Sequence, residues 1–166
     1  METNGTMQLN RAGKYLTFEL KGEIYGLEIL KVQEIIGLMN VTRVPKTPDF
    51  IRGVINLRGK VIPVVDLRLK FMMESKEDSE RTCIIVVQFK SAAAAMTMGI
   101  IVDEVKEVVN IENGQIEDTP SFGADTNTDF ILGVGKVNQK VVMLLDVDKV
   151  LSYGDATLME QTIEQV

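Results

Sequence analysis

Carboxylates, amines and guanidinium groups are almost the only side chains in this sequence that could do chemistry. The 166-residue chain holds 24 Asp and Glu, 18 Lys and Arg, one Cys and no His, with a net charge of −6. The absence of His excludes Ser-His-Asp and Cys-His nucleophile systems, a His phospho-acceptor and His-containing zinc sites. A single Cys cannot form a thiolate cage, and an acidic chain is a poor binder of nucleic-acid phosphates. We therefore expect no catalytic residues, no metal and no other cofactor.

Two carboxylates stand out by their position in the chain. Asp66 and Asp146 occupy the same place in two copies of a repeated segment, and a catalytic residue would have little reason to occur in both. We interpret them as structural caps for the turn or helix that follows each strand. Stretches resembling a phosphate loop at 132–139 and a calcium loop at 125–136 lack residues that those motifs require.

An internal repeat determines the predicted architecture. Residues 50–71 match residues 130–151 without a gap at a spacing of 80, with seven identical pairs. Residues 26–36 match residues 99–109 at a spacing of 73, in the same order within each half. Two matches in the same order indicate a duplication, and the richness in Val and Ile favours strands in both copies.

The duplication predicts an all-β fold of two tandem five-stranded β-barrels, because closing each sheet removes exposed edges. Short helical segments are expected at the connections and near the C-terminus, and the groove between two packed barrels is a common binding location. The predicted parts are a flexible arm, a first barrel half, a second barrel half and a tail, with strand exchange between the halves left open. Their bounds are residues 1–14, 15–81, 82–151 and 152–166.

The location of the protein follows from what the sequence lacks. The N-terminus has no apolar segment typical of a signal peptide, and no apolar run reaches the length of a membrane span. The single Cys fits a reducing compartment. A cytoplasmic protein is expected.

One long string of residues is specific to a family. PxFIRGVINLRGKVIPVVDLR, which begins at Pro48, together with the segments at 25–37 and 99–109, resembles the CheW-like domain family of bacterial chemotaxis proteins over about residues 15–151. The resemblance implies two SH3-like barrels and a non-enzymatic adaptor. Such an adaptor couples methyl-accepting chemotaxis receptors to the histidine kinase CheA. It is expected to be a monomer in isolation and to assemble with these partners into arrays at the inner face of the membrane.

The resemblance directs attention to a set of residues expected to bind the receptor. We expect a salt bridge between Glu34 and Arg58, with apolar and turn residues around it. The set is Val32, Glu34, Ile35, Gly53, Asn56, Leu57, Arg58, Val86 and Val87. For the four Val and Ile residues, core packing is the alternative to a groove floor. Strand alternation predicts that one of Val86 and Val87 faces inward and the other faces the second barrel or a groove. Gly53 is expected to allow close approach of another backbone segment.

A second set is expected to contact the kinase, with one surface on each barrel. It consists of Val41, Arg43, Val44, Pro45, Gln115, Ile116 and Phe122. Phe122 is interpreted either as an interface anchor or as a cover over the end of its own barrel. Gly133, like Asp66 and Asp146, is assigned a structural role.

Two alternatives stay open at this point. The chain could be a CheW-like regulatory domain of a CheA- or CheV-type protein, or a small ligand-binding β-barrel protein. A buried polar pocket with perturbed carboxylates would support the ligand-binding barrel, whereas two barrels filled by side chains would not.

Overall fold

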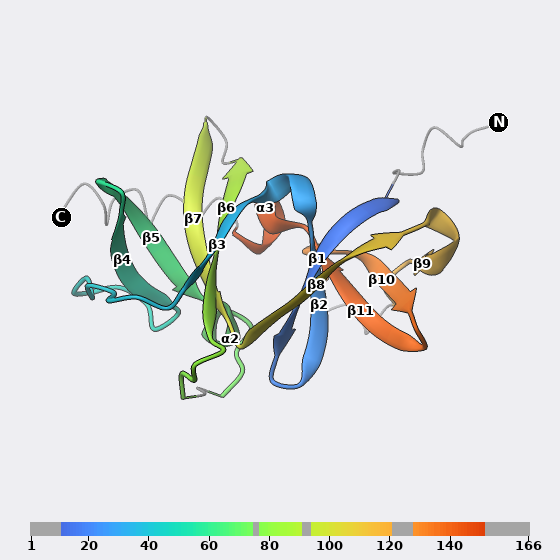
Figure 1. The fold of residues 1–166 in the computed structure, drawn as a ribbon, viewed down its shortest axis with the longest axis horizontal. Coiled ribbons are helices and arrows are strands. Elements are labelled where there is room, and N and C mark those ends of the chain that lie inside the picture. Colours follow the sequence, from blue (N-terminus) through green and yellow to red (C-terminus); the bar gives the residue numbers. More distant parts are fainter. Residues whose placement is uncertain (1–10, 75–76, 91–93, 121–127, 152–166) are drawn as a thin grey trace.

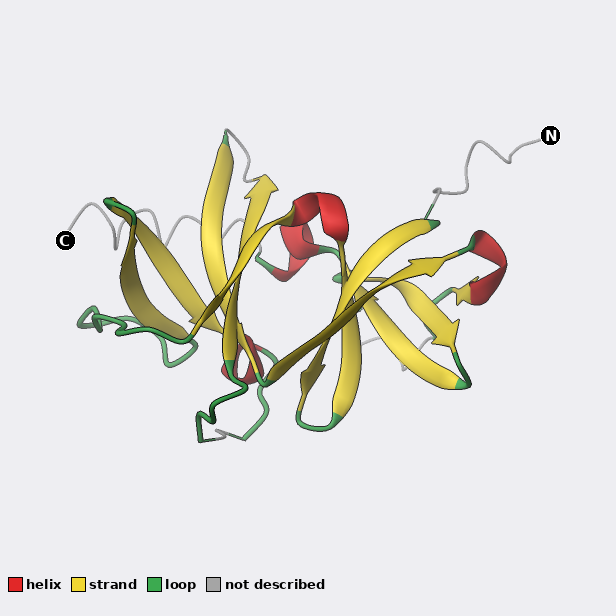
Figure 2. Ribbon diagram, in the orientation of Figure 1, coloured by secondary structure: helices red, strands yellow, loops and turns green. Residues whose placement is uncertain are grey.

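The computed structural model describes residues 11–74, 77–90, 94–120 and 128–151, which consist mainly of β strands (Figures 1 and 2). The strands are β1 (Gly13–Leu20), β2 (Glu23–Glu28), β3 (Val32–Gly37), β4 (Ile51–Leu57), β5 (Lys60–Asp66), β6 (Cys83–Lys90), β7 (Ala95–Val102), β8 (Glu104–Ile111), β9 (Ile116–Glu117), β10 (Ile131–Val137) and β11 (Lys140–Leu145). The short helices are η1 (Ile29–Lys31), α2 (Leu67–Lys70), η2 (Asn113–Gln115) and α3 (Val147–Val150). The predicted all-β fold with short helical connections is confirmed.

The strands form two sheets that lie side by side (Figure 1). One sheet has the order β3-β6-β7-β5-β4 and forms barrel 1, and the other has the order β8-β1-β2-β11-β10-β9 and forms barrel 2. The sequence repeat makes β8, β10 and β11 the counterparts of β3, β4 and β5. With these substitutions the two orders agree, and β9 is the additional strand of barrel 2.

The two repeats have exchanged strands. β1 and β2 lie in the predicted first half but belong to barrel 2, whereas β6 and β7 lie in the predicted second half but belong to barrel 1. The predicted boundary at residue 81 therefore does not separate the barrels. Alternation of apolar residues specifies which face of a strand is buried, but it does not specify the strand's neighbour.

A short segment closes each barrel in the same way. In barrel 1, the Thr42 N–H donates to the Val54 carbonyl oxygen at 2.8 Å, and the Val54 N–H donates to the Thr42 carbonyl oxygen at 2.9 Å. In barrel 2, β9 pairs with β10, and Glu117 lies opposite Val134. Because Val134 is the repeat counterpart of Val54, both copies cover their edge at the same position.

The described residues do not include Phe122, the predicted tail at 152–166 or most of the predicted arm at 1–14. At the end of the predicted arm, β1 already begins at Gly13. The Arg11 guanidinium also donates to the Leu132 carbonyl oxygen at 3.0 Å. The arm was therefore predicted too long, because its last residues are bound to barrel 2.

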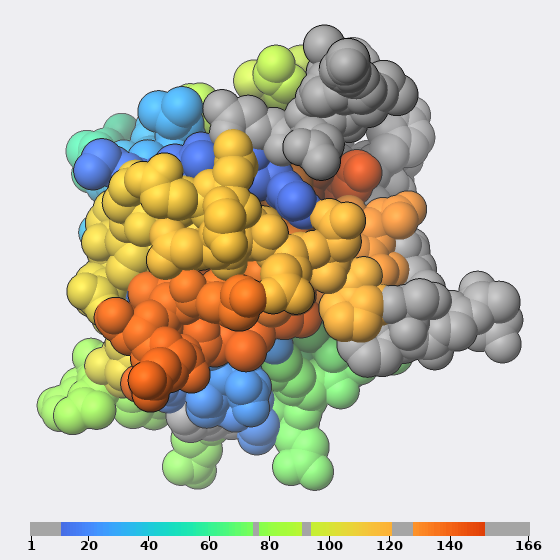
Figure 3. Space-filling view, turned by 90° about the vertical axis from the view of Figure 1, so that its right-hand side faces the viewer, coloured from blue at the N-terminus to red at the C-terminus, as the bar shows by residue number. Residues whose placement is uncertain are grey.

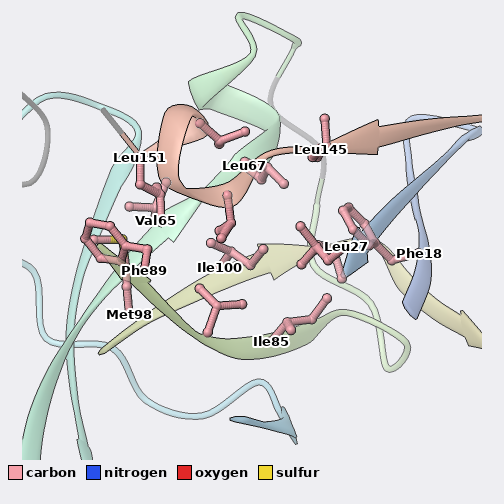
Figure 4. Packing of buried hydrophobic residues seen from close by; sticks show 14 of the residues in the cluster. Phe18, Leu27, Val65, Leu67, Ile85, Phe89, Met98, Ile100, Leu145 and Leu151 are labelled. Atoms are coloured by element: carbon pink, nitrogen blue, oxygen red, sulfur yellow. The ribbon is translucent and has the colours of Figure 1, made fainter. Parts of the chain in front are cut away.

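The largest apolar cluster lies between the barrels and takes side chains from both (Figure 4). Barrel 2 contributes Phe18, Leu27 and Leu145, and barrel 1 contributes Val65, Ile85, Phe89, Met98 and Ile100. Each barrel also has its own interior cluster, centred on Val64 and Ile84 in barrel 1 and on Tyr15 and Leu144 in barrel 2. The barrels are thus filled by side chains and joined by a shared core.

The two repeated aspartates cap helices, as predicted. The Asp66 carboxylate accepts a bond from the Arg68 backbone N–H at 3.0 Å, at the start of α2. The Asp146 carboxylate accepts the corresponding bond from the Asp148 N–H at 3.1 Å, at the start of α3. Both caps satisfy a helix donor that has no partner within the helix.

One copy of the repeat also contains a buried ion cluster that sequence reasoning missed. The Arg68 side chain is 1% exposed and donates to Asp66 at 2.9 Å, to Asp103 at 3.1 Å and to Asp78 at 3.1 Å. Arg52, whose side chain is more exposed than that of Arg68, forms ion pairs with the same two carboxylates, Asp66 and Asp78. The position equivalent to Arg68 in the second repeat is Asp148, so within the described ranges only the first repeat contains this cluster.

Asp103 connects this ion cluster of barrel 1 to barrel 2. It lies between β7 and β8, where the chain passes from barrel 1 to barrel 2. Its carboxylate accepts a bond from the Lys21 backbone N–H at 2.7 Å, and its own N–H donates to the Glu19 carbonyl oxygen at 3.0 Å. Arg68 in barrel 1 is thereby linked to the β1–β2 turn of barrel 2.

Removing Arg68 should destabilise the protein strongly. In Arg68→Ala the carboxylates of Asp66 and Asp103 stay buried without their cation, which costs about 3–5 kcal/mol of unfolding free energy. Urea unfolding measures the loss. The matched control is Arg81→Ala, whose side chain is 70% exposed and lies 3.7 Å from Glu104, and which should cost less than about 1 kcal/mol. A similar small loss in both variants would contradict the prediction.

The same cluster should make stability depend on acid pH. Burial by itself raises the pKa of Asp78, but hydrogen bonds and charge from Arg52 and Arg68 outweigh it, and the net pKa is lowered. The stabilisation is therefore complete above the ordinary Asp pKa of about 3.9 and is lost as pH falls through the lower value of the folded protein. Asp78→Asn should remove this part of the acid sensitivity in urea unfolding measured across a pH series. An unchanged pH profile would contradict it.

Candidate functional site

An exposed ion pair forms the centre of the candidate site in barrel 1. The guanidinium of Arg58 contacts the carboxylate of Glu34, as predicted. Arg58 lies in the two-residue turn between β4 and β5, and Glu34 lies on β3 beside a bulge in its pairing with β6. The Arg58 side chain is 69% exposed, so the pair adds only about 0.2–1 kcal/mol to stability. Its contribution is to orient two charged groups on the surface.

The turn that carries Arg58 has a conformation set by its sequence. Arg58 and Gly59 both have positive φ, at +53° and +86°, as required by the two-residue turns that join twisted strands. The Asn56 side-chain oxygen accepts a bond from the Gly59 N–H at 2.8 Å. Asn56 therefore stabilises the turn, and its contact with the receptor stays a prediction.

Exposed apolar side chains lie in the same two segments as the ion pair. Ile35, next to Glu34, is 44% exposed, and Val61, just beyond the turn, is 43% exposed. Val61 was not predicted as a site residue. Leu57 and Val32 are partly buried and pack against the interior and shared clusters. Charged and apolar groups are thus exposed in the same two segments, and such a mixture is suited to binding another protein.

Two residues predicted to form the floor of the receptor-binding groove have no exposed surface. Val86 and Val87 are both 0% exposed. Val86 packs in the interior of barrel 1, and Val87 packs in the core shared with barrel 2. The predicted alternation is confirmed, but their assignment as direct receptor contacts is wrong for this structure, because β6 is covered on both faces.

Gly53 supports barrel closure and makes no exposed contact. It has φ of +144°, and a Cβ atom there would lie 2.1 Å from the Thr42 carbonyl oxygen. This is the predicted close backbone approach. At Gly133, its repeat counterpart, a Cβ atom would lie 3.0 Å from the Glu117 carbonyl oxygen, which agrees with the predicted structural role.

The predicted kinase contacts lie on two separate barrels. Arg43 and Pro45 are exposed in the segment that closes barrel 1. Val41 is partly buried there, and Val44 is buried. Gln115 belongs to η2 of barrel 2, where its side chain accepts a bond from the Glu112 N–H at 2.8 Å. Ile116 packs inside barrel 2. Val44 and Ile116 are therefore unsuited as direct contacts in this structure.

The most exposed of the large apolar residues was also missed. Leu30, in η1, is 95% exposed, the highest value among the large apolar side chains of the described residues. The apolar residues of 30–37 fit neither the helical nor the strand period, and this irregularity is the signal in the sequence that could have indicated an exposed apolar side chain. A short helical turn before β3 explains both the mismatch and the exposure.

Neither a metal cluster nor a membrane-spanning helix occurs in the part of the chain that the structure describes. Among the described residues no group of three or more Cys, Asp or Glu side chains could hold a metal ion. No helix in the described ranges is long and apolar enough to cross a membrane. The buried carboxylates Asp66 and Asp103 face Arg68, so they do not form the polar pocket of a ligand-binding barrel.

Two SH3-like barrels with a shared core are the architecture of a scaffold protein to which this chain is similar. A family model for the CheW-like domain matches residues 14–154, and the chain belongs to this family. It is 40% identical over 147 residues to the chemotaxis protein CheW of Klebsiella aerogenes, covering 89% of this chain and 86% of that protein. Identity to the Bacillus subtilis CheW is 31%, with coverage of 88% and 91%. Its role is that of a chemotaxis adaptor.

Comparison with a solved structure agrees with this assignment. The fold is similar to the crystal structure of the scaffolding protein TtCheW from Thermoanaerobacter tengcongensis, with a TM-score of 0.75, 34% identity, and coverage of 87% of this chain and 95% of that one. The CheV alternative has weaker support. The Helicobacter pylori protein CheV3 is 29% identical, and the match covers only 41% of its length.

Adding a side chain at Gly53 should break the closure of barrel 1. Gly53→Ala should cost about 3 kcal/mol or more of unfolding free energy, because overpacking and left-handed strain each cost about 1–3 kcal/mol. The control is Gly37→Ala, where a Cβ atom meets nothing within 4 Å. Urea unfolding compares the two variants. If Gly53→Ala were as stable as the control, the close approach would not matter for folding.

Proposed function

We propose that the chain couples methyl-accepting chemotaxis receptors to the histidine kinase CheA, without catalysing a reaction itself. The receptor docks at the barrel 1 surface around Glu34 and Arg58, called the Arg58 face below. The observation that carries this proposal is an exposed ion pair in two segments that also carry the exposed apolar residues Ile35 and Val61.

The Arg58 face suits a helical partner. The cytoplasmic tip of such a receptor is a helical hairpin, as the family resemblance implies, and a helix presents apolar and charged residues one turn apart. Ile35 and Val61 add exposed apolar surface in the same two segments. In the described structure only Nη2 of Arg58 contacts Glu34, which leaves further guanidinium donors for a carboxylate on the partner.

The kinase is expected to bind elsewhere on the molecule. Arg43 and Pro45 on barrel 1 and Gln115 on barrel 2 have accessible surface and support this assignment. Phe122, outside the described residues, belongs to the same proposal. Separate surfaces would let an adaptor hold two partners at once, at the inner face of the membrane where the receptors end.

Reconstitution tests the proposed function. Purified CheA, a receptor cytoplasmic fragment and this protein are combined, and kinase autophosphorylation is measured with and without each component. Stimulation of the kinase by the receptor only when this protein is present supports the coupling role. Equal stimulation without the protein would exclude it.

Arg58→Ala should weaken receptor binding without unfolding the protein. Loss of the cation and of its contacts at the centre of an interface should raise the Kd for the receptor fragment about tenfold, which corresponds to about 1.4 kcal/mol. Titration calorimetry measures the Kd, and urea unfolding should change by less than about 1 kcal/mol. Arg81→Ala, at another exposed arginine, is the control and should bind as the parent protein does. Equal affinity in both variants would remove Arg58 from the receptor site.

A further inference from the structure

Two crossings of the chain between the barrels are each bound by the short helix at the end of a repeated segment. At Asp103 the chain passes from barrel 1 to barrel 2, and Arg68 of α2 binds it there at 3.1 Å. At η1 the chain passes from barrel 2 to barrel 1 (Figure 2). There the Lys31 amine donates to the Asp148 carboxylate of α3 at 3.1 Å. Arg68 and Asp148 are equivalent at the repeat spacing of 80, so equivalent positions bind both crossings with opposite charges.

The two sites also share a hydrogen bond to a β-hairpin. The Asp103 carboxylate accepts the Lys21 N–H in the β1–β2 turn at 2.7 Å. The Asp148 carboxylate accepts the Lys90 N–H at 2.9 Å, where β6 ends and the chain continues to β7. In the matched sheet orders β1 and β2 correspond to β6 and β7. Each site therefore joins one carboxylate to a cation and to the equivalent hairpin, but the cation and the carboxylate have changed places between the helix and the crossing.

The two sites differ in burial. The Arg68 and Asp103 side chains are almost completely buried, whereas Lys31 and Asp148 are 29% and 30% exposed. A partly exposed ion pair contributes little to the free energy of unfolding, unlike a buried pair that loses one partner. The contact between Lys31 and Asp148 is therefore suited to setting the position of a segment, while Arg68 and the shared core hold the fold.

Lys31 is surrounded by further carboxylates at its crossing. Burial raises the pKa of Glu28, and the positive charge of Lys31 opposes this rise. The charges of Asp146 and Asp148 add to the rise. Carboxylates that precede η1 and belong to α3 thus repel each other, and Lys31 is the cation between them. Without its charge, α3 would no longer attract η1.

The segment that Lys31 positions is the start of β3. Lys31 ends η1, β3 begins at Val32, and Glu34 of the Arg58 face follows two residues later. Between Val32 and Glu34 the pairing of β3 with β6 shifts its register, and such an irregularity weakens the ladder locally. The Asp148 carboxylate binds both Lys31 and the Lys90 N–H of β6. It therefore holds the start of β3 and the end of β6 against α3.

We propose that Asp148 is a positioning residue for receptor binding, which acts through Lys31 to fix the start of β3 and, with it, Glu34 in the Arg58 face. Asp148 itself makes no contact with the receptor. The inference rests on the proposed function, because receptor affinity is the property that depends on the position of Glu34. A residue that follows the last strand of barrel 2 would thereby adjust a binding face on barrel 1.

Two substitutions break the contact from opposite sides. Asp148→Asn removes the charge but keeps an oxygen that can accept the Lys90 N–H, and Lys31→Met removes the cation but leaves the bond between Asp148 and Lys90. Each should raise the Kd of the full chain for a purified receptor cytoplasmic fragment about fivefold in titration calorimetry. The double variant should also lose about fivefold, because both changes remove the same contact. Lys31→Arg, which keeps the charge, should bind as the parent protein does.

Lys106→Met is the matched control. Lys106 is a partly exposed lysine whose ion pairs, to Glu19 at 3.6 Å and to Glu104 at 3.5 Å, lie within barrel 2. It belongs to β8, which is yellow on the face of barrel 2 that Figure 3 shows. The control should keep the Kd of the parent protein. In the free protein, the amide NMR signal of Glu34 should shift in Asp148→Asn and stay unchanged in Lys106→Met.

Urea unfolding separates positioning from stability. The midpoints of Asp148→Asn and Lys31→Met should change no more than that of Lys106→Met, because all three remove a partly exposed ion pair. A larger loss of stability, with no shift of the Glu34 signal, would assign the contact a structural role only and overturn the inference.

Three binding results would also overturn it. An unchanged Kd in Asp148→Asn and Lys31→Met, with normal binding by the parent protein, would refute the positioning role while the proposed function stands. Losses that multiply to about 25-fold in the double variant would mean that the two side chains act on the receptor independently. Absence of any receptor binding by the parent protein would reject the proposed function and the inference together.

Discussion

The apolar core shared by the two barrels is the constraint on which the rest of the structure depends. β1 and β6 are buried on both faces, so each strand belongs to the interior of one barrel and to the contact between barrels. Neither barrel can separate without exposing Phe18, Ile85 and Val87 to water, which is unfavourable in proportion to the apolar area exposed. The exchange of strands between the repeats adds to this constraint, because each barrel then contains strands from both halves of the chain.

The buried Arg68 cluster adds direction to this apolar contact. Hydrophobic burial is not directional, whereas Arg68 must meet Asp66 and Asp103 at hydrogen-bond distance. Since Asp103 also binds the β1–β2 turn, the cluster links the two barrels at the point where the chain crosses between them. The two barrels are therefore held at a defined separation and orientation, which would suit the proposed binding of two partners.

Several features could be predicted from particular residues because they depend on neighbours in sequence. The turn at Arg58 and Gly59, the caps at Asp66 and Asp146, and the two-sided burial of β6 all have local signatures. The Glu34–Arg58 contact was predicted through the family resemblance. Arg68 was not predicted, because nothing in a sequence marks an arginine as buried until its carboxylate partners are known. For Val86 the sequence left a groove floor and the core as alternatives, since a covered strand and a groove floor have the same apolar pattern.

The sequence by itself determined that the chain is a duplicated β protein of the CheW-like family, because spacing, turn residues and apolar alternation are all visible along one dimension. Only the tertiary structure decided which strands pair, and with them the exchange between repeats, since hydrogen-bonded edges carry no side-chain code for their neighbour. It also decided which copies of equivalent residues are exposed and which are paired in charge. Glu34 and Glu107 occupy equivalent positions in the two repeats. Arg58, in the β4–β5 turn, pairs with Glu34, whereas Asn138, at the equivalent position of the β10–β11 turn, has no charge to pair with Glu107.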